Sequence, residues 1–149
     1  MPVRFFREYD FKLKFPRKTS AWLTSAARRE KKRVGELNYI FCSDDFLLSL
    51  NQRFLKHNTL TDIISFDSSE GAIICGEIYI SIERVQENSQ KFGVEFENEL
   101  RRVMVHGVLH FCGYSDKQSR QKAVMRKKEE AYLSLWEKMF HVKPAKRRR

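Results

Sequence analysis

The sequence is poor in the features that mark secreted, membrane-bound or multidomain proteins. Its 149 residues include only three cysteines, three prolines and six glycines. Cys42, Cys75 and Cys112 form no Cys-x-x-Cys pair, which fits reduced thiols in a cytosolic protein, and we expect all three to be small core residues. No stretch approaches the roughly 18 apolar residues of a membrane span, and the first residues lack the apolar core of a signal peptide. We therefore expect a cytoplasmic protein with no membrane partner.

Linkers and internal repeats are also missing. We find no Pro/Gly/Ser-rich stretch between segments and no repeat of roughly 20 to 50 residues. With 42% hydrophobic residues, a chain of this length can bury one core. We expect a single domain over residues 1–142, followed by a basic tail, 143–149, that carries five positive charges in seven residues. Such a tail should be disordered and solvated, and it either improves solubility or contacts phosphates.

The chain has far more positive than negative charge. Lys and Arg total 29 against 19 Asp and Glu, which gives a formal net charge of +10. A field of this sign attracts polyanions, so nucleic acid is the first partner to consider. Charge alone does not decide the matter, because a basic surface can also serve solubility or weak membrane contact.

Hydrophobic periodicity and capping residues predict alternating strands and helices. The expected strands lie in residues 3–15, as one strand or a pair, and at 36–42, 63–66 and 77–80. The expected helices cover residues 18–32, a segment capped by Ser43 with apolar positions up to Phe54, a segment from Ser81 to Phe92, and residues 95–112 and 119–140. The helix over 95–112 is apolar on nearly every side, as a helix through the middle of a domain should be. The pattern predicts a layered domain of both α and β elements.

Two histidines on this central helix have the spacing of metal ligands. His106 and His110 are four residues apart, and at roughly 100° per residue they lie on one helix face, one turn from each other. Gly113 can end the helix in a left-handed conformation, so that Asp116 returns toward the two imidazoles. This set predicts a metal site of His106, His110 and Asp116 with an open position for a catalytic water. A structural histidine pair, satisfied by backbone groups, is the alternative.

The residue after the first histidine separates two kinds of metal-dependent hydrolase. Metzincin-type proteases share the His-x-x-x-His-x-x-Gly-x-x-ligand spacing, but they need a Glu directly after the first His as general base. Here that position is Gly107, so a peptidase lacks the group that activates water. A phosphodiester demands less of a protein base, since a metal polarises the phosphoryl oxygen and lowers the pKa of its bound water. Phosphodiester cleavage, by hydrolysis or by transesterification with a ribose 2′-hydroxyl as nucleophile, is therefore the preferred reaction, and peptide hydrolysis is an alternative.

Three motifs resemble those of the YbeY family, bacterial metal-dependent endoribonucleases that process ribosomal RNA. HGVLHFCGYSD is similar to the family's metal-binding signature, LNQRFLKHNTLTDIISF to its second motif and GEIYIS to its Gly-Asp-Ile strand, over roughly residues 36–130. The resemblance implies an α+β, zincin-like fold with a small mixed four-stranded sheet and about five helices. It also implies one zinc ion and single-stranded RNA as substrate. The implied roles are 16S rRNA 3′-end maturation, ribosome biogenesis and ribosome quality control, with ribosomal RNA and the small ribosomal subunit or its proteins as partners.

The chain departs from the family pattern at two positions. Asp116 stands where the family usually has a third His, and a carboxylate ligand suits zinc but also makes other divalent transition metals plausible. Leu55 stands where the family commonly has an Arg thought to assist catalysis. The nearby candidates to bind RNA phosphate are Arg53, Lys56 and His57, each of which could equally be a solvated loop residue.

Other polar residues near the motifs are expected to be structural. Thr61 and Asp62 can tie their loop to its own backbone, and Glu129 and Glu130 on the last helix are expected to form surface ion pairs. Two functions compete with that of an endoribonuclease. One is a non-catalytic ribosome-assembly factor whose ion holds the fold, and the other is a metallopeptidase with a base from elsewhere in the chain.

Overall fold

Strands and helices alternate along the chain in the computed structural model, which describes residues 2–55 and 61–148. Within those residues the elements are β1 (Val3–Arg7), α1 (Pro16–Arg29), β2 (Arg33–Cys42), α2 (Asp44–Leu50), the π-helical η1 (Asn51–Leu55), β3 (Ile63–Asp67), β4 (Ile73–Ser81), α3 (Ile82–Phe92), α4 (Phe96–Phe111) and α5 (Ser119–Phe140). The expected α+β class, with a mixed four-stranded sheet and five α-helices, is confirmed.

The sheet has the order β1-β2-β4-β3. β1 pairs with β2 and β2 with β4 in parallel, whereas β3 runs antiparallel to β4, from the Ile63–Ile80 pair to the Asp67–Gly76 pair. Because side chains alternate along a strand, β2 and β4 each present two different faces. The two faces carry two separate apolar clusters.

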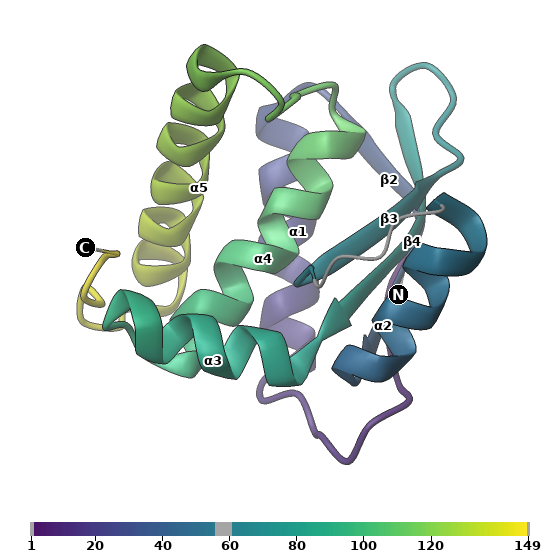
Figure 1. Ribbon diagram of the computed structural model, residues 1–149. Coiled ribbons are helices and arrows are strands. Elements are labelled where there is room, and N and C mark those ends of the chain that lie inside the picture. The colour runs from purple at the N-terminus through teal and green to yellow at the C-terminus, as the bar shows by residue number, and fades with distance from the viewer. Residues whose placement is uncertain (1, 56–60, 149) are drawn as a thin grey trace.

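The larger cluster lies between the sheet and the helices on one side of it. α1 and α4 cover this face, and α5 packs on their outer side (Figure 1). The smaller cluster, formed by Cys42, Leu47 and Ile64, lies under α2 on the opposite face. The first face is therefore the one on which the chain builds its deep core, and α4 lies in the middle of that core.

α4 is buried along most of its length, as its apolar sequence predicts. Eleven of its 16 residues are buried. A Cβ placed on Gly107 would lie 2.7 Å from Cδ1 of Ile78, so a glycine lets the helix lie close to β4. This close packing fixes the height of α4 above the sheet and hence the position of the residues on its other side.

Several boundaries differ from the expected ones. β1 ends at Arg7 instead of reaching residue 15, because the following segment leads into Pro16, which occupies the first turn of α1. β4 begins earlier than expected, at Ile73, where it pairs with Arg33. Cys42 is buried as expected, but Cys75 and Cys112 are only half-buried. Among the described residues, no helix is long and apolar enough to cross a membrane.

Gly76 provides a test of the packing between β4, β3 and α4. Its φ is +154°, and a Cβ there would lie 2.3 Å from the carbonyl oxygen of Phe66 and 2.8 Å from the ring of Phe111. Gly76→Ala should therefore lower the free energy of unfolding by about 2–3 kcal/mol, measured by urea denaturation. Gly71→Ala is the control: its φ is +58° but no atom lies within 4 Å, so we expect a loss of only about 1 kcal/mol. Equal losses would contradict this account.

Candidate metal centre

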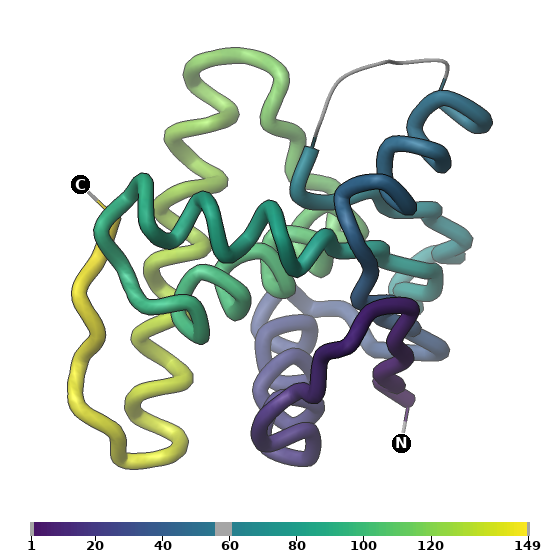
Figure 2. Tube along the Cα trace, turned by 60° about the horizontal axis from the view of Figure 1, so that its bottom comes forward, coloured from purple at the N-terminus to yellow at the C-terminus, as the bar shows by residue number. Residues whose placement is uncertain are grey.

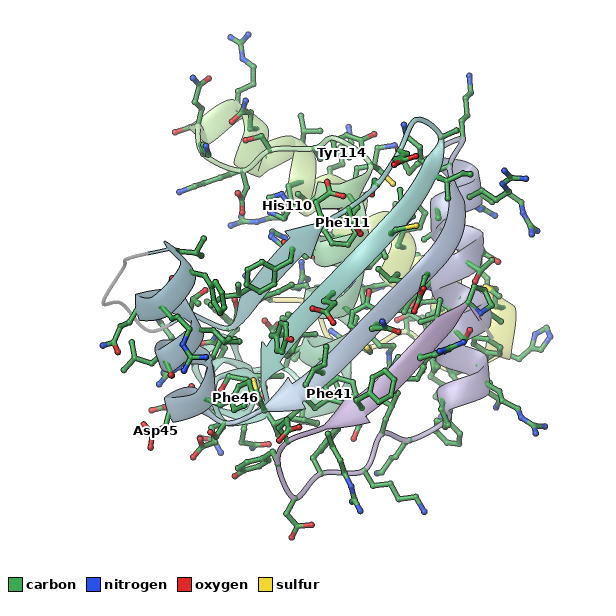
Figure 3. The ribbon with its side chains drawn as sticks, turned by 90° about the vertical axis from the view of Figure 1, so that its right-hand side faces the viewer. Phe41, Asp45, Phe46, His110, Phe111 and Tyr114 are labelled. Carbon is green, nitrogen blue, oxygen red and sulfur yellow. The ribbon has the colours of Figure 1, made fainter. Side chains whose placement is uncertain are left out.

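The structure brings His106, His110 and Asp116 together at one end of α4. Nε2 of His106 lies 3.3 Å from Oδ2 of Asp116, and Nε2 of His110 lies 3.5 Å from Oδ1 of the same carboxylate. All three ligand atoms lie within 4.8 Å of one another. His110 is grouped with Phe111 and Tyr114 at one end of the sheet, away from Phe41 and Asp45 (Figure 3).

These separations suit a divalent transition metal. Zinc binds imidazole nitrogen and carboxylate oxygen at about 2.0–2.1 Å, so two ligands of a tetrahedral ion lie about 3.3 Å apart. The two distances to Asp116, 3.3 and 3.5 Å, agree with this value. Two imidazoles and one carboxylate also form a donor set that leaves one tetrahedral position for solvent or substrate. The residues present therefore fit a single bound ion.

The end of α4 explains how Asp116 reaches the histidines. Gly113 has a φ of +105°, in the region that glycine adopts without strain. Its N–H donates to the carbonyl of His110 at 3.0 Å, and the N–H of Tyr114 donates to the carbonyl of Leu109 at 3.0 Å. The chain thus reverses over the last turn of the helix, as the sequence predicts. Asp116, three residues after Gly113, therefore lies beside the imidazoles of the two histidines.

A buried carboxylate outside the site holds this turn in place. Glu30, which follows α1, accepts a hydrogen bond from the hydroxyl of Tyr114 at 2.7 Å and one from Nζ of Lys128 at 3.0 Å. The hydroxyl of Tyr132 also donates to it. Burial acts to raise the pKa of Glu30, but these hydrogen bonds outweigh it and hold the pKa below its ordinary value. Glu30 therefore ties the turn before Asp116 to both α1 and α5.

Glu129 corrects one expectation from the sequence. It forms an ion pair, as expected, but the residue is only 7% exposed and its side chain contacts His106 instead of lying at the surface. Its Oε2 lies 2.6 Å from Nδ1 of His106, and its Oε1 accepts from Nη1 of Arg102 at 2.9 Å. α5 packs against α4 with this carboxylate inward. Glu130, one residue on, is more exposed and pairs with Arg102 and Arg147.

The contact with Glu129 sets the protonation of His106. A carboxylate only accepts hydrogen bonds, so Nδ1 carries the proton and the Nε2 lone pair faces the cluster, the arrangement that orients histidine ligands in metal sites. Burial acts to lower the pKa of His106, yet the hydrogen bond and charge of Glu129 raise it above its ordinary value. Burial and the charge of His106 lower the pKa of His110. The same hydrogen bond holds the pKa of Glu129 down against burial.

The cluster opens into a groove of about 390 Å³. The groove is lined by Thr61, Asp62, Ile63, Arg102, Val103, His106, His110, Asp116, Glu129 and Arg148. Carboxylates therefore outnumber guanidinium groups in its walls, which favours a cation at the cluster. Thr61 does hydrogen-bond its own loop, at the carbonyl of Ile63, as expected, whereas Asp62 lines the groove.

Gly107 and Arg53 do not line the groove. Gly107 faces Ile78 of the sheet, so no side chain at this position could act on a bound water. Arg53 lies on the exposed η1 with its guanidinium 5.9 Å from the ring centre of Phe54, and it does not line the groove. Leu55 is 46% exposed. Lys56 and His57 fall outside the described residues.

Comparisons with known proteins agree with this geometry. The sequence model of the family described as Endoribonuclease YbeY matches residues 7–137. The chain belongs to this family. A relative named Endoribonuclease YbeY from Flavobacterium psychrophilum is 52% identical over 95% of this chain and 98% of its own length. Another of that name, from Christiangramia forsetii, is 46% identical over 94% of this chain and 95% of its own length.

One solved structure of similar fold extends the comparison. The solution structure of TM1509 from Thermotoga maritima has a TM-score of 0.65 and 28% sequence identity, and the match covers 93% of this chain and 91% of that one. The expected family is thus confirmed over most of the chain. The cluster of His106, His110 and Asp116 could be predicted from the sequence. The role of Glu129 could not, because no local motif says which face of α5 meets α4.

The hydrogen bond between Glu129 and His106 predicts a loss of metal affinity when it is weakened. Glu129→Gln keeps the shape of the side chain but removes the charge that orients and polarises the imidazole. We expect zinc affinity, measured by competition with a chromophoric chelator, to fall about 10- to 100-fold. Glu130→Gln is the matched control, since it makes the same change one residue away without touching a ligand, and its affinity should equal that of the wild type. A similar loss in both variants would contradict the assignment.

The hydrogen bond from Tyr114 to Glu30 predicts a second effect on the metal. Tyr114→Phe frees the turn that carries Asp116, so zinc affinity should fall several-fold. Tyr132→Phe removes another hydrogen bond to Glu30 but leaves the turn attached. Each variant should lose about 1 kcal/mol of unfolding free energy, and only Tyr114→Phe should change zinc affinity. If the two variants bind zinc equally, Glu30 only stabilises the fold.

Proposed function

We propose that this chain is a metal-dependent endoribonuclease that cleaves single-stranded RNA, acting in 16S rRNA 3′-end maturation, ribosome biogenesis and ribosome quality control. The observation that carries the proposal is the cluster of His106, His110 and Asp116, oriented by Glu129 and open to a groove, in a member of the YbeY family. A zinc ion is the proposed cofactor, and another divalent transition metal would fit the same donors. When bound, the ion would polarise the phosphodiester and lower the pKa of a coordinated water.

The chain's own groups have separate tasks in this reaction. Glu129 holds His106 in the tautomer that leaves Nε2 free for the ion. Arg102, buried and held by Glu129 and Glu130, places a fixed positive charge in the groove wall, where negative charge grows on the phosphate in the transition state. These groups are held in place before the substrate arrives, so little reorganisation is needed during the reaction.

Asp62 is suited to proton transfer. Its carboxyl lines the groove and is not one of the three clustered ligands. Burial raises the pKa of Asp62 above its ordinary value, although the charge of His106 counters part of the increase. A carboxyl with a raised pKa exchanges protons closer to neutral pH, which general acid–base catalysis requires. We assign to it the transfer of a proton to or from an oxygen of the RNA.

The net charge supports a polyanionic substrate and ribosomal partners. A formal charge of +10 attracts RNA over long range, and the groove itself is too rich in carboxylates to supply that attraction. Ribosomal RNA and the small ribosomal subunit or its proteins are the proposed partners. The cytoplasm, where this RNA is processed, is the proposed location.

Removal of one ligand tests the proposal directly. His110→Ala should lose stoichiometric metal, measured by elemental analysis of protein purified without added metal, because two ligands hold an ion poorly. Its cleavage of a single-stranded RNA, followed on denaturing gels, should fall about a hundredfold or more. His141→Ala removes an exposed histidine at the end of α5 and should keep both properties.

Other outcomes select between the competing functions. Full metal content in His110→Ala would show that His110 is not a ligand of the ion. Metal-loaded wild type that cuts no RNA, yet restores rRNA processing in cells, would favour an assembly factor with a structural ion. Cleavage of unstructured peptides by the loaded protein would restore the peptidase alternative.

A further inference from the structure

The C-terminal segment does not extend into solvent as its composition suggests. After α5 the chain turns back along that helix and ends beside α3 and the start of α4 (Figures 1 and 2). Arg147 pairs with Glu137 at 2.9 Å and with Glu130 at 2.8 Å, and the carbonyl of Lys146 accepts from Asn98 at 3.5 Å. The segment is therefore attached to α5 and α4 up to its last described residue.

That last residue, Arg148, reaches the metal groove. Its Nε donates to Oε1 of Glu99 at 3.2 Å, and its Nη2 donates to Oε2 of the same carboxylate. Its guanidinium lies 4.0 Å from the ring centre of Phe92. The side chain is 25% exposed and lines the groove with His106 and Arg102. A carboxylate and an aromatic ring thus hold the guanidinium plane in one orientation.

Burial of the Glu99 carboxylate carries a large desolvation penalty unless a charged partner offsets it. Glu99 is fully buried on α4, and an ionised carboxylate in such a place needs a charged partner. Arg102 lies farther away, with its Nε 3.7 Å from Glu99, and is already engaged by Glu129 and Glu130. Glu99 therefore serves chiefly to hold Arg148 at the groove.

One edge of the Arg148 guanidinium remains available to a ligand. Glu99 occupies Nε and Nη2, and Nη1 makes no hydrogen bond with another described residue. A guanidinium held in this way can still donate from its second nitrogen to a phosphate oxygen. Because the group is already fixed by Glu99 and Phe92, binding a phosphate costs little side-chain entropy.

The position of Arg148 places this edge away from the cluster. Glu99 and His106 are seven residues apart on the same face of α4, which is about two turns and roughly 10 Å along the axis. One strand of nucleic acid lying along the helix would meet the metal ligands at one end and Arg148 at the other. The groove is thus built to contact two phosphates of the same strand.

We propose that Arg148 forms a phosphate-binding subsite for the RNA substrate, contacting a phosphate of the same strand next to the one that reacts at His106, His110 and Asp116. The subsite rests on the proposed endoribonuclease function and adds to it the C-terminal segment as part of the substrate groove. Arg148 holds the strand in register, and Arg147 holds the segment on α5.

Arg148→Ala and Lys143→Ala make a matched pair, because each removes one positive charge from the same segment, and Lys143 is exposed and does not line the groove. Binding of a fluorescent single-stranded RNA to zinc-loaded protein would be measured by anisotropy at several salt concentrations. Arg148→Ala should bind about tenfold more weakly than Lys143→Ala at equal salt. Its slope of log affinity against log salt should be smaller in size by about 0.7, the loss of one phosphate contact. Zinc content should be unchanged in both variants.

Neutral linkages locate the contact on the RNA. In a series of oligonucleotides, a single methylphosphonate replaces one phosphodiester at a time. The wild type should lose affinity at one position next to the cleavage site, and Arg148→Ala should show no loss at that position. Arg148→Lys, which keeps a charge beside Glu99 and so protects the fold, should lie between the two in affinity.

Three results would overturn the subsite. Equal binding by the Arg148→Ala and Lys143→Ala proteins would show that only overall charge matters. Arg148→Lys binding equal to wild type in the full linkage series would show that the planar guanidinium group is not needed. Tighter binding after Arg148→Ala would show that the segment blocks the groove. A wild type that binds RNA in the expected linkage pattern but cuts none would contradict the proposed activity and leave the subsite standing.

Discussion

The hydrogen bond between His106 and Glu129 connects the metal site to the rest of the molecule. It joins α4 to α5 where buried ionisable residues of the two helices meet, and it continues through Arg102 to Glu130. Glu129 and Arg102 would each be unfavourable alone in such a buried place, and each is stabilised by its charged neighbours. The packing of α5 on α4 is therefore also the condition under which His106 can present its lone pair to an ion.

The remaining ligand geometry follows from two glycines, one in the C-terminal half of α4 and one just after its end. At Gly107 the helix lies close enough to β4 that its height above the sheet is fixed, and at Gly113 it stops in a turn that only glycine adopts cheaply. Glu30 then anchors the turn from outside. The Gly113 turn and the hydrogen bond between Tyr114 and Glu30 thus fix the position of Asp116. The turn fixes where residue 116 lies, so that in the proposed site a carboxylate stands beside the two imidazoles.

Much of the fold was predictable because its signals are local. The period of α4, the Gly113 turn and the capping of α2 by Ser43 can each be read within a few residues, and so can the spacing of His106 and His110. The helix over Ser119–Phe140 was expected with the same bounds.

What could not be predicted depends on which faces meet. Glu129 reads as a surface residue because its neighbours in the sequence are charged, and only the docking of α5 turns it inward. Glu30 and Glu99 are likewise separated by many residues from the groups they hold, Tyr114 and Arg148. Long-range pairs of this kind leave no trace in local periodicity.

The groove wall, with carboxylates outnumbering guanidinium groups, contrasts with a protein that carries a formal charge of +10 overall. The two fields act over different distances: the diffuse positive charge acts across solvent and weakens with salt, whereas the groove acts only at contact. The encounter with an RNA strand and the binding of that strand in the groove are consequently separate events. The first is fast and indifferent to sequence. In the proposed function the second depends on whether a cation already occupies the three ligands, so that metal supply would decide which encounters lead to cleavage.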